Sequence, residues 1–102
     1  MRKKIENALF ELGITPDLTG FDYIRCAIEI ILSSKDRVQI VKGLYADIAK
    51  QFNTRSQLVE RAIRYAFSKM DKESEAFIKY FGLEKPTNSV LLYTLAYRLR
   101  EK

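Results

Sequence analysis

Histidine is absent from this 102-residue chain, and cysteine occurs only once, at Cys26. Without histidine, the chain lacks the commonest general base and the commonest metal ligand of proteins. A single cysteine excludes an intrachain disulfide and argues against a zinc cluster, so Cys26 is interpreted as a small apolar residue on a helix. No cluster of carboxylates suggests a catalytic site. We therefore expect no enzyme activity, no cofactor and no metal site.

Long apolar runs are also missing. The longest, AIEIILSS at residues 27–34, is interrupted by Glu29, so no segment is apolar enough to span a bilayer. The basic N-terminus MRKKIENALF is too charged, and its apolar part too short, for a signal peptide. We therefore expect a cytoplasmic protein that does not associate with a membrane.

Glycine and proline are sparse, with four and two residues, and they fall where helical patterns end. No stretch alternates apolar and polar residues over the length of a strand, whereas the helical period is strong almost throughout. The pattern predicts one all-α domain over residues 1–102, a bundle of six or seven helices. The expected helices are Lys3–Leu12, Asp22–Ser33, Lys35–Lys42, Tyr45–Phe52, Arg55–Met70, Lys72–Phe81 and a last one that is capped by Thr87 or Asn88 and ends at about Arg100.

Two of these helices, joined by a tight turn, fit the helix-turn-helix pattern over about residues 45–70. Ile48 and Phe52 are one turn apart and are expected to face the core. Asn53 lies at the turn, where a positive φ is often needed and where Asn tolerates it better than most residues. Thr54 is the expected N-cap of the second helix.

The second helix of the motif divides into two faces. Its apolar face is expected to be buried and consists of Val59, Ala62, Ile63, Ala66, Phe67 and Met70. In this motif the first part of the second helix enters the major groove, where Arg bonds guanine, Gln pairs with adenine and Glu accepts from cytosine. The residues expected to contact bases are Gln57, Glu60, Arg61, Arg64 and Tyr65.

The net positive charge is concentrated in the same stretch. The chain has a net charge of +5, and residues 53–69 supply +3 of it, from four basic residues and one acidic residue. Because phosphate neutralisation supplies much of the affinity for DNA, this charge favours a polyanionic partner. The residues expected to contact the DNA backbone are Lys50, Thr54, Arg55, Ser56 and Lys69. From the pattern alone, an ordinary solvated helix face is an equally good interpretation.

Five segments then point to a known family. In chain order they are GFDYIRCAI, GLYADIAKQFNT, VERAIRYA, YFG and KPTNS. In this combination the chain resembles the C-terminal effector domain of the stage-zero sporulation response regulator A family, over about residues 5–100. The resemblance implies an all-α, DNA-binding transcription regulator of the bacterial cytoplasm, associated with the nucleoid. It also implies promoter boxes as the DNA partner, a dimer on tandem sites, and contact with RNA polymerase sigma factor.

The resemblance also shows where this chain departs from the family. The positions that the family uses at the DNA are held here by Glu60, Arg61 and Arg64. Where the family commonly has Ser, Arg and His, this chain has Gln57, Leu58 and Tyr65. Leu58 is limited to apolar contacts, either with a thymine methyl group or with the preceding helix. The family's box sequence therefore does not carry over to this chain.

Full-length members of the family carry a phosphate-accepting receiver domain, and none is present in this chain. The chain is either a piece of a longer protein or a stand-alone paralogue without the phosphorylation switch. The segment between VERAIRYA and KPTNS, in the region implicated in contacting sigma factor, is shorter than usual. A rival function is therefore a protein-interaction module or competitor, which binds sigma factor or the full-length regulator without activating transcription.

Overall fold

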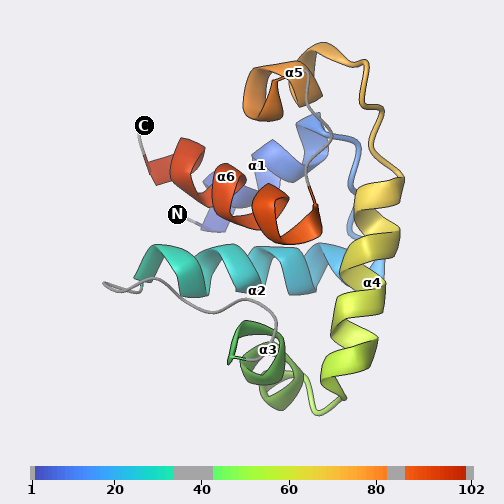
Figure 1. Ribbon diagram of the computed structural model, residues 1–102, viewed down its shortest axis with the longest axis vertical. Coiled ribbons are helices and arrows are strands. Elements are labelled where there is room, and N and C mark those ends of the chain that lie inside the picture. Colours follow the sequence, from blue (N-terminus) through green and yellow to red (C-terminus); the bar gives the residue numbers. More distant parts are fainter. Residues whose placement is uncertain (1, 34–42, 83–86, 101–102) are drawn as a thin grey trace.

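The computed structural model describes residues 2–33, 43–82 and 87–100, and within these ranges it contains six α-helices and no strand (Figure 1). The helices are α1 (Arg2–Glu11), α2 (Thr19–Ser33), α3 (Tyr45–Gln51), α4 (Ser56–Ser68), α5 (Glu75–Phe81) and α6 (Asn88–Arg100). The all-α prediction is confirmed, while the expected helix Lys35–Lys42 lies outside the described residues. None of the described helices has the length and apolar character needed to cross a membrane.

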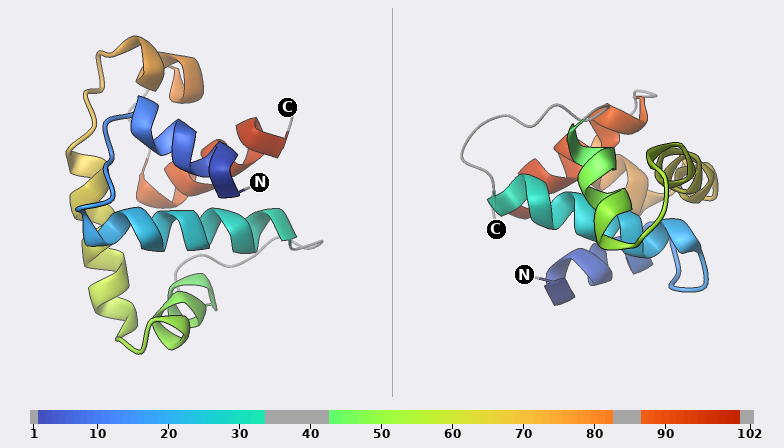
Figure 2. Two further views of the ribbon diagram at one scale, coloured as in Figure 1. Left: turned by 180° about the vertical axis from the view of Figure 1, so that it is seen from behind. Right: turned by 90° about the horizontal axis from the view of Figure 1, so that it is seen from below.

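The long helix α2 lies at the centre of the molecule. Figures 1 and 2 show α1 and α6 on one side of α2, α3 on the other, and α4 across its N-terminal end. The helix contacts all four of these neighbours. A helix so enclosed must be apolar around most of its circumference. Its buried residues are Gly20, Phe21, Tyr23, Ile24, Cys26, Ala27, Ile28 and Ile31.

The turn between α3 and α4 is a Schellman motif with Asn53 in the left-handed position. Asn53 has φ 53° and is the only non-glycine residue with positive φ in the described ranges. The amides of Asn53 and Thr54 donate to the carbonyls of Lys50 and Ala49 over 3.4 and 2.9 Å. Helix α1 ends in the same motif, with Gly13 in the left-handed position. The prediction for Asn53 is confirmed.

The start of α4 differs from the prediction. Its N-cap is Arg55, with an extended backbone at φ −108° and ψ 147° and no side-chain capping bond. Thr54 is not the cap, because it still belongs to the turn that ends α3, where its amide donates to the carbonyl of Ala49. The prediction for Phe52 is also wrong, since 39% of Phe52 is exposed and its ring packs edge-on against Tyr23, with centroids 5.1 Å apart. Ile48 is fully buried, as predicted.

Two further helix starts differ from the prediction. Helix α2 begins at Thr19, three residues before the expected Asp22, and α5 begins at Glu75, three residues after the expected Lys72. The start of α5 is fixed by Ser74, whose Oγ accepts a hydrogen bond from a backbone amide of the first turn over 3.1 Å. The other helix bounds in the described ranges agree with the prediction to within two residues.

Replacing Asn53 with alanine is expected to lower the free energy of unfolding by about 1 kcal/mol, because the left-handed conformation costs an ordinary residue roughly 1–2 kcal/mol. Asn53→Gly removes the side chain but relieves this strain, so its stability should equal or exceed that of the parent. Urea unfolding followed by circular dichroism measures both variants. Equal destabilisation of the two would contradict the prediction, since it would point to a lost side-chain contact.

Tyr80 joins α5 to α1 through a hydrogen bond. Its hydroxyl donates to Glu11 Oε1 over 3.1 Å, and Lys79 Nζ lies 3.4 Å from Glu11 Oε2. Burial, and then the hydrogen bond to Glu11, raises the pKa of Tyr80 from 10.0 to about 12. Because folding favours the protonated phenol, the resulting stability is complete below pH 10 and is lost as the pH rises towards 12.

Tyr80→Phe is therefore expected to make the free energy of unfolding less dependent on pH between 10 and 12. The measurement is urea unfolding at a series of pH values in that window. Tyr97→Phe is the matched control, because it removes the same hydroxyl group from a tyrosine that is 59% exposed. The same pH dependence in the parent and in the Tyr80 variant would contradict this prediction.

Candidate nucleic-acid interface

Helices α3 and α4 form the helix-turn-helix that the sequence predicts. They are steeply inclined to one another, as the views in Figures 1 and 2 agree, and they pack directly together. Ile48 and Ala49 of α3 are buried, as are Val59 and Ile63 of α4. This packing fixes α4 through one face and leaves its opposite face at the surface.

The apolar face of α4 is buried as predicted, apart from Ala62, which is only partly buried. Helices α2 and α4 approach closely at Gly20, where a Cβ atom would lie 2.4 Å from the carbonyl oxygen of Ala62 and 2.8 Å from Cβ of Ala66. Gly20 therefore sets the spacing between the core helix and α4. The sequence signal for this role is a glycine at the start of the GFDYIRCAI segment, with small residues four positions apart on α4.

All five predicted base-contact residues lie on the surface side of α4. Gln57, Arg61, Arg64 and Tyr65 are exposed, and Glu60 is partly buried. Arg64 Nη1 lies 3.2 Å from Glu60 Oε1, one helical turn away. Arg61 forms no ion pair with any residue in the described part of the chain. The Arg61 charge is therefore available to a ligand, whereas the Arg64 charge is shared with Glu60.

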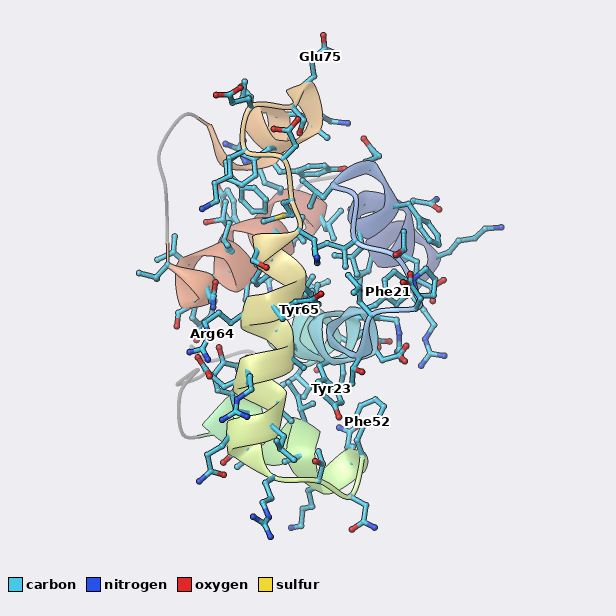
Figure 3. All side chains as sticks on the ribbon, turned by 90° about the vertical axis from the view of Figure 1, so that its right-hand side faces the viewer. Phe21, Tyr23, Phe52, Arg64, Tyr65 and Glu75 are labelled. Atoms are coloured by element: carbon cyan, nitrogen blue, oxygen red, sulfur yellow. The ribbon has the colours of Figure 1, made fainter. Side chains whose placement is uncertain are left out.

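Arg61 lies between two grooves, one on each side of α4. The polar groove has a volume of about 360 Å³ and is lined by Tyr45, Ser56, Gln57, Glu60, Arg61 and Arg64. The apolar groove has a volume of about 540 Å³, and its lining includes Leu18, Gly20, Tyr23, Leu58, Ala62 and Tyr65, together with Arg61. Figure 3 shows Arg64 on one side of α4, and Tyr23 and Phe52 on the other. The exposed surface of α4 thus has two chemically distinct flanks.

Sequence reasoning missed Tyr45, the first residue of α3. It is 4% exposed, yet it lines the polar groove across from α4. Burial, and then the charge of Glu60, raises the pKa of the Tyr45 hydroxyl, so the phenol stays protonated and can donate a hydrogen bond. Nothing in the local pattern distinguishes Tyr45 from an ordinary core aromatic residue.

The apolar flank contains Leu58 and Tyr65. Leu58 is 47% exposed, so its side chain is not buried against α3 and instead lines the apolar groove. Tyr65 is 55% exposed, and Lys69 Nζ lies 4.8 Å from the centre of its ring. This cation–π contact keeps the Lys69 charge beside the tyrosine at the C-terminal end of α4.

The residues expected to contact the DNA backbone fall into two groups. The first group lies at or beside the turn between α3 and α4, with Lys50 and Arg55 exposed and Thr54 and Ser56 partly buried. Lys69 lies at the opposite end of α4, about 20 Å away by the rise of the helix. The structure therefore places positive charge near both ends of the exposed face.

The chain also matches a known protein family. A family model described as "Sporulation initiation factor Spo0A C terminal" matches residues 5–99 of the 102-residue chain. The match begins in α1 and ends in α6, so it includes the helix-turn-helix and the exposed face of α4. The resemblance seen in the sequence motifs is thereby confirmed.

Proposed function

Because the chain belongs to the sporulation initiation factor Spo0A C-terminal family, we propose that it is a sequence-specific DNA-binding domain whose α4 enters the major groove. The family is one of DNA-binding effector domains of transcription regulators, and not of enzymes. One observation carries the proposal. The polar flank of α4 presents Gln57, Glu60, Arg61 and Arg64 on a helix that is held in place only through its opposite face.

Each side chain of the polar flank suits a different base edge. Arg61 and Arg64 can donate in a bidentate way to guanine O6 and N7, Gln57 can pair with adenine, and Glu60 can accept from cytosine N4. The ion pair between Glu60 and Arg64 holds the guanidinium in place before binding. Arg64 is exposed and Glu60 is only partly buried, so we assign this pair to positioning and not to stability.

Backbone contacts orient such a helix on the duplex. We expect Lys50 and Arg55 at the turn, and Lys69 at the far end, to contact the phosphates that flank the major groove. Thr54 and Ser56 add hydroxyl donors at the turn. In this arrangement the backbone contacts fix the register, while the row of side chains on α4 selects the sequence. The site of action would be promoter DNA in the bacterial cytoplasm.

The test is selection of bound duplexes from a random-sequence DNA library, followed by gel-shift titration of the enriched box at several salt concentrations. We expect enrichment of one box, and an affinity that falls linearly with salt on a logarithmic scale, because bound phosphates release counterions. A scrambled duplex of the same composition is the control for non-specific binding. Retention of no duplex at low salt, or equal affinity for the box and the scrambled duplex, would refute the proposal.

A second candidate function is a protein-interaction module or competitor that binds sigma factor or the full-length regulator. It is favoured by the exposure of Leu58 and Tyr65, which are apolar residues on a helix that would otherwise be polar at the surface. Capture of purified sigma factor or full-length regulator, with no measurable binding to any duplex in the library, would favour this function. Binding to the enriched box without activation of a promoter reporter would favour the competitor.

A further inference from the structure

The apolar groove lies beside the polar flank, and the two share Arg61. Leu58 and Tyr65 form the α4 wall of this groove, and Leu18 and Tyr23 line it from the loop before α2 and from α2 itself. A ligand that follows α4 along the polar flank therefore reaches the apolar groove without leaving the helix surface. This continuity indicates one ligand for both flanks.

The chemistry of the apolar groove limits which part of a DNA duplex it can accept. The lining carries one carboxylate, Asp17, and one guanidinium, Arg61, so it has no net charge with which to attract phosphate, and its other residues are uncharged. An uncharged base edge is the part of a duplex that fits such a lining. The apolar group that a base pair presents in the major groove is the 5-methyl group of thymine.

The position of Leu58 within α4 favours the same occupant. Leu58 is the third residue of the helix, and the N-terminal residues of a recognition helix contact base edges. Its half-exposed side chain has free apolar surface to bury, as has the ring of Tyr65, held at the same wall of the groove.

We propose that Leu58, in the wall of the apolar groove, binds the 5-methyl group of a thymine, so that the two flanks of α4 read different parts of one box. The polar flank would read base edges through hydrogen bonds, and the apolar groove would read a methyl group through burial. This inference rests on the proposed function, because it requires α4 to lie in the major groove. It makes Leu58 a specificity-determining residue of this chain.

The test replaces each thymine of the selected box, one at a time, with deoxyuridine, which lacks only the methyl group. At one or two positions we expect the affinity of the parent protein to fall about three- to fivefold, the effect of removing one buried methyl group. Leu58→Ala should bind the thymine box more weakly, and its affinity should no longer respond to deoxyuridine at those positions. Ile78→Ala, a change at a similarly exposed aliphatic residue on α5, should respond as the parent does.

The possible outcomes separate this inference from the proposed function. Specific binding to the box with no sensitivity to any deoxyuridine, or with equal sensitivity in the parent and Leu58→Ala, would overturn the inference alone. Absence of specific DNA binding in the parent would overturn both. If Leu58→Ala instead weakened self-association or capture of sigma factor and left every DNA affinity unchanged, the groove would be a protein-binding site and the inference would fall. Thermal unfolding of the variant checks that it is folded.

Discussion

Replacing Gly20 with alanine is expected to destabilise the protein by about 3 kcal/mol, at the upper end of the cost of overpacking a core. The added Cβ would lie 2.4 Å from the carbonyl oxygen of Ala62, which is a backbone atom and has no rotamer to change. Relief therefore requires α2 and α4 to move apart, which opens gaps along their shared interface. Alanine gains only about 0.5–1 kcal/mol over glycine in helix propensity, so the steric cost is larger. Urea unfolding followed by circular dichroism measures the net effect.

The matched control is Gly43→Ala, because no atom of the described residues, apart from its chain neighbours, lies within 4 Å of a Cβ added at Gly43, and its φ is not positive. Its free energy of unfolding should change by less than about 0.5 kcal/mol. Because Gly20 sets the distance of α4 from the core, the folded fraction of the Gly20 variant should also bind the selected box more weakly. If Gly20→Ala proved as stable as Gly43→Ala, the close approach of α2 and α4 would not be a constraint on the fold.

The sequence predicts most of the helices because the periodic spacing of apolar residues is a local pattern, and the residues that it marks are the ones that the fold buries. Asn53 is predicted for a similar reason, since the choice of residue for a left-handed position depends on its own backbone. The predicted start of α5 is wrong because a local hydrogen bond competes with the first turn of the helix. Asp71 Oδ1 accepts the Glu73 amide over 2.9 Å, which forms a turn, and α5 begins only after Ser74.

The candidate site is predicted less completely than the fold. The sequence predicts the polar flank of α4, because its residues and the buried residues lie on one helix and the helical period assigns them to opposite faces. Gly20 and Tyr45 were missed because their roles depend on contacts with α4 from other helices. Helical spacing predicts Phe52 in the core, but α3 ends at Gln51, so that spacing no longer fixes where the Phe52 side chain points. Contacts between elements need the tertiary arrangement, which the pattern alone does not supply.

Replacing Arg61 with alanine is expected to weaken binding to the selected box about tenfold to a hundredfold, the usual cost of losing a bidentate contact to guanine. Arg61 is the residue that both grooves share, so it lies at the middle of the proposed interface. Arg64→Ala should have a smaller effect, because Glu60 already shares the Arg64 charge at 3.2 Å. Gel-shift titration against the box and against its single-base variants measures affinity and specificity together.

Two further variants separate base readout from charge. Arg61→Lys keeps the charge but not the planar fork, so it should retain the salt dependence of the parent while losing discrimination at one base pair. Arg98→Ala removes an exposed positive charge from α6, on the far side of α2 from α3, and should leave both affinity and specificity unchanged. If Arg61→Lys kept the full specificity of the parent, Arg61 would contact phosphate and not a base. If Arg61→Ala and Arg98→Ala bound the box equally well, α4 would not be the recognition helix.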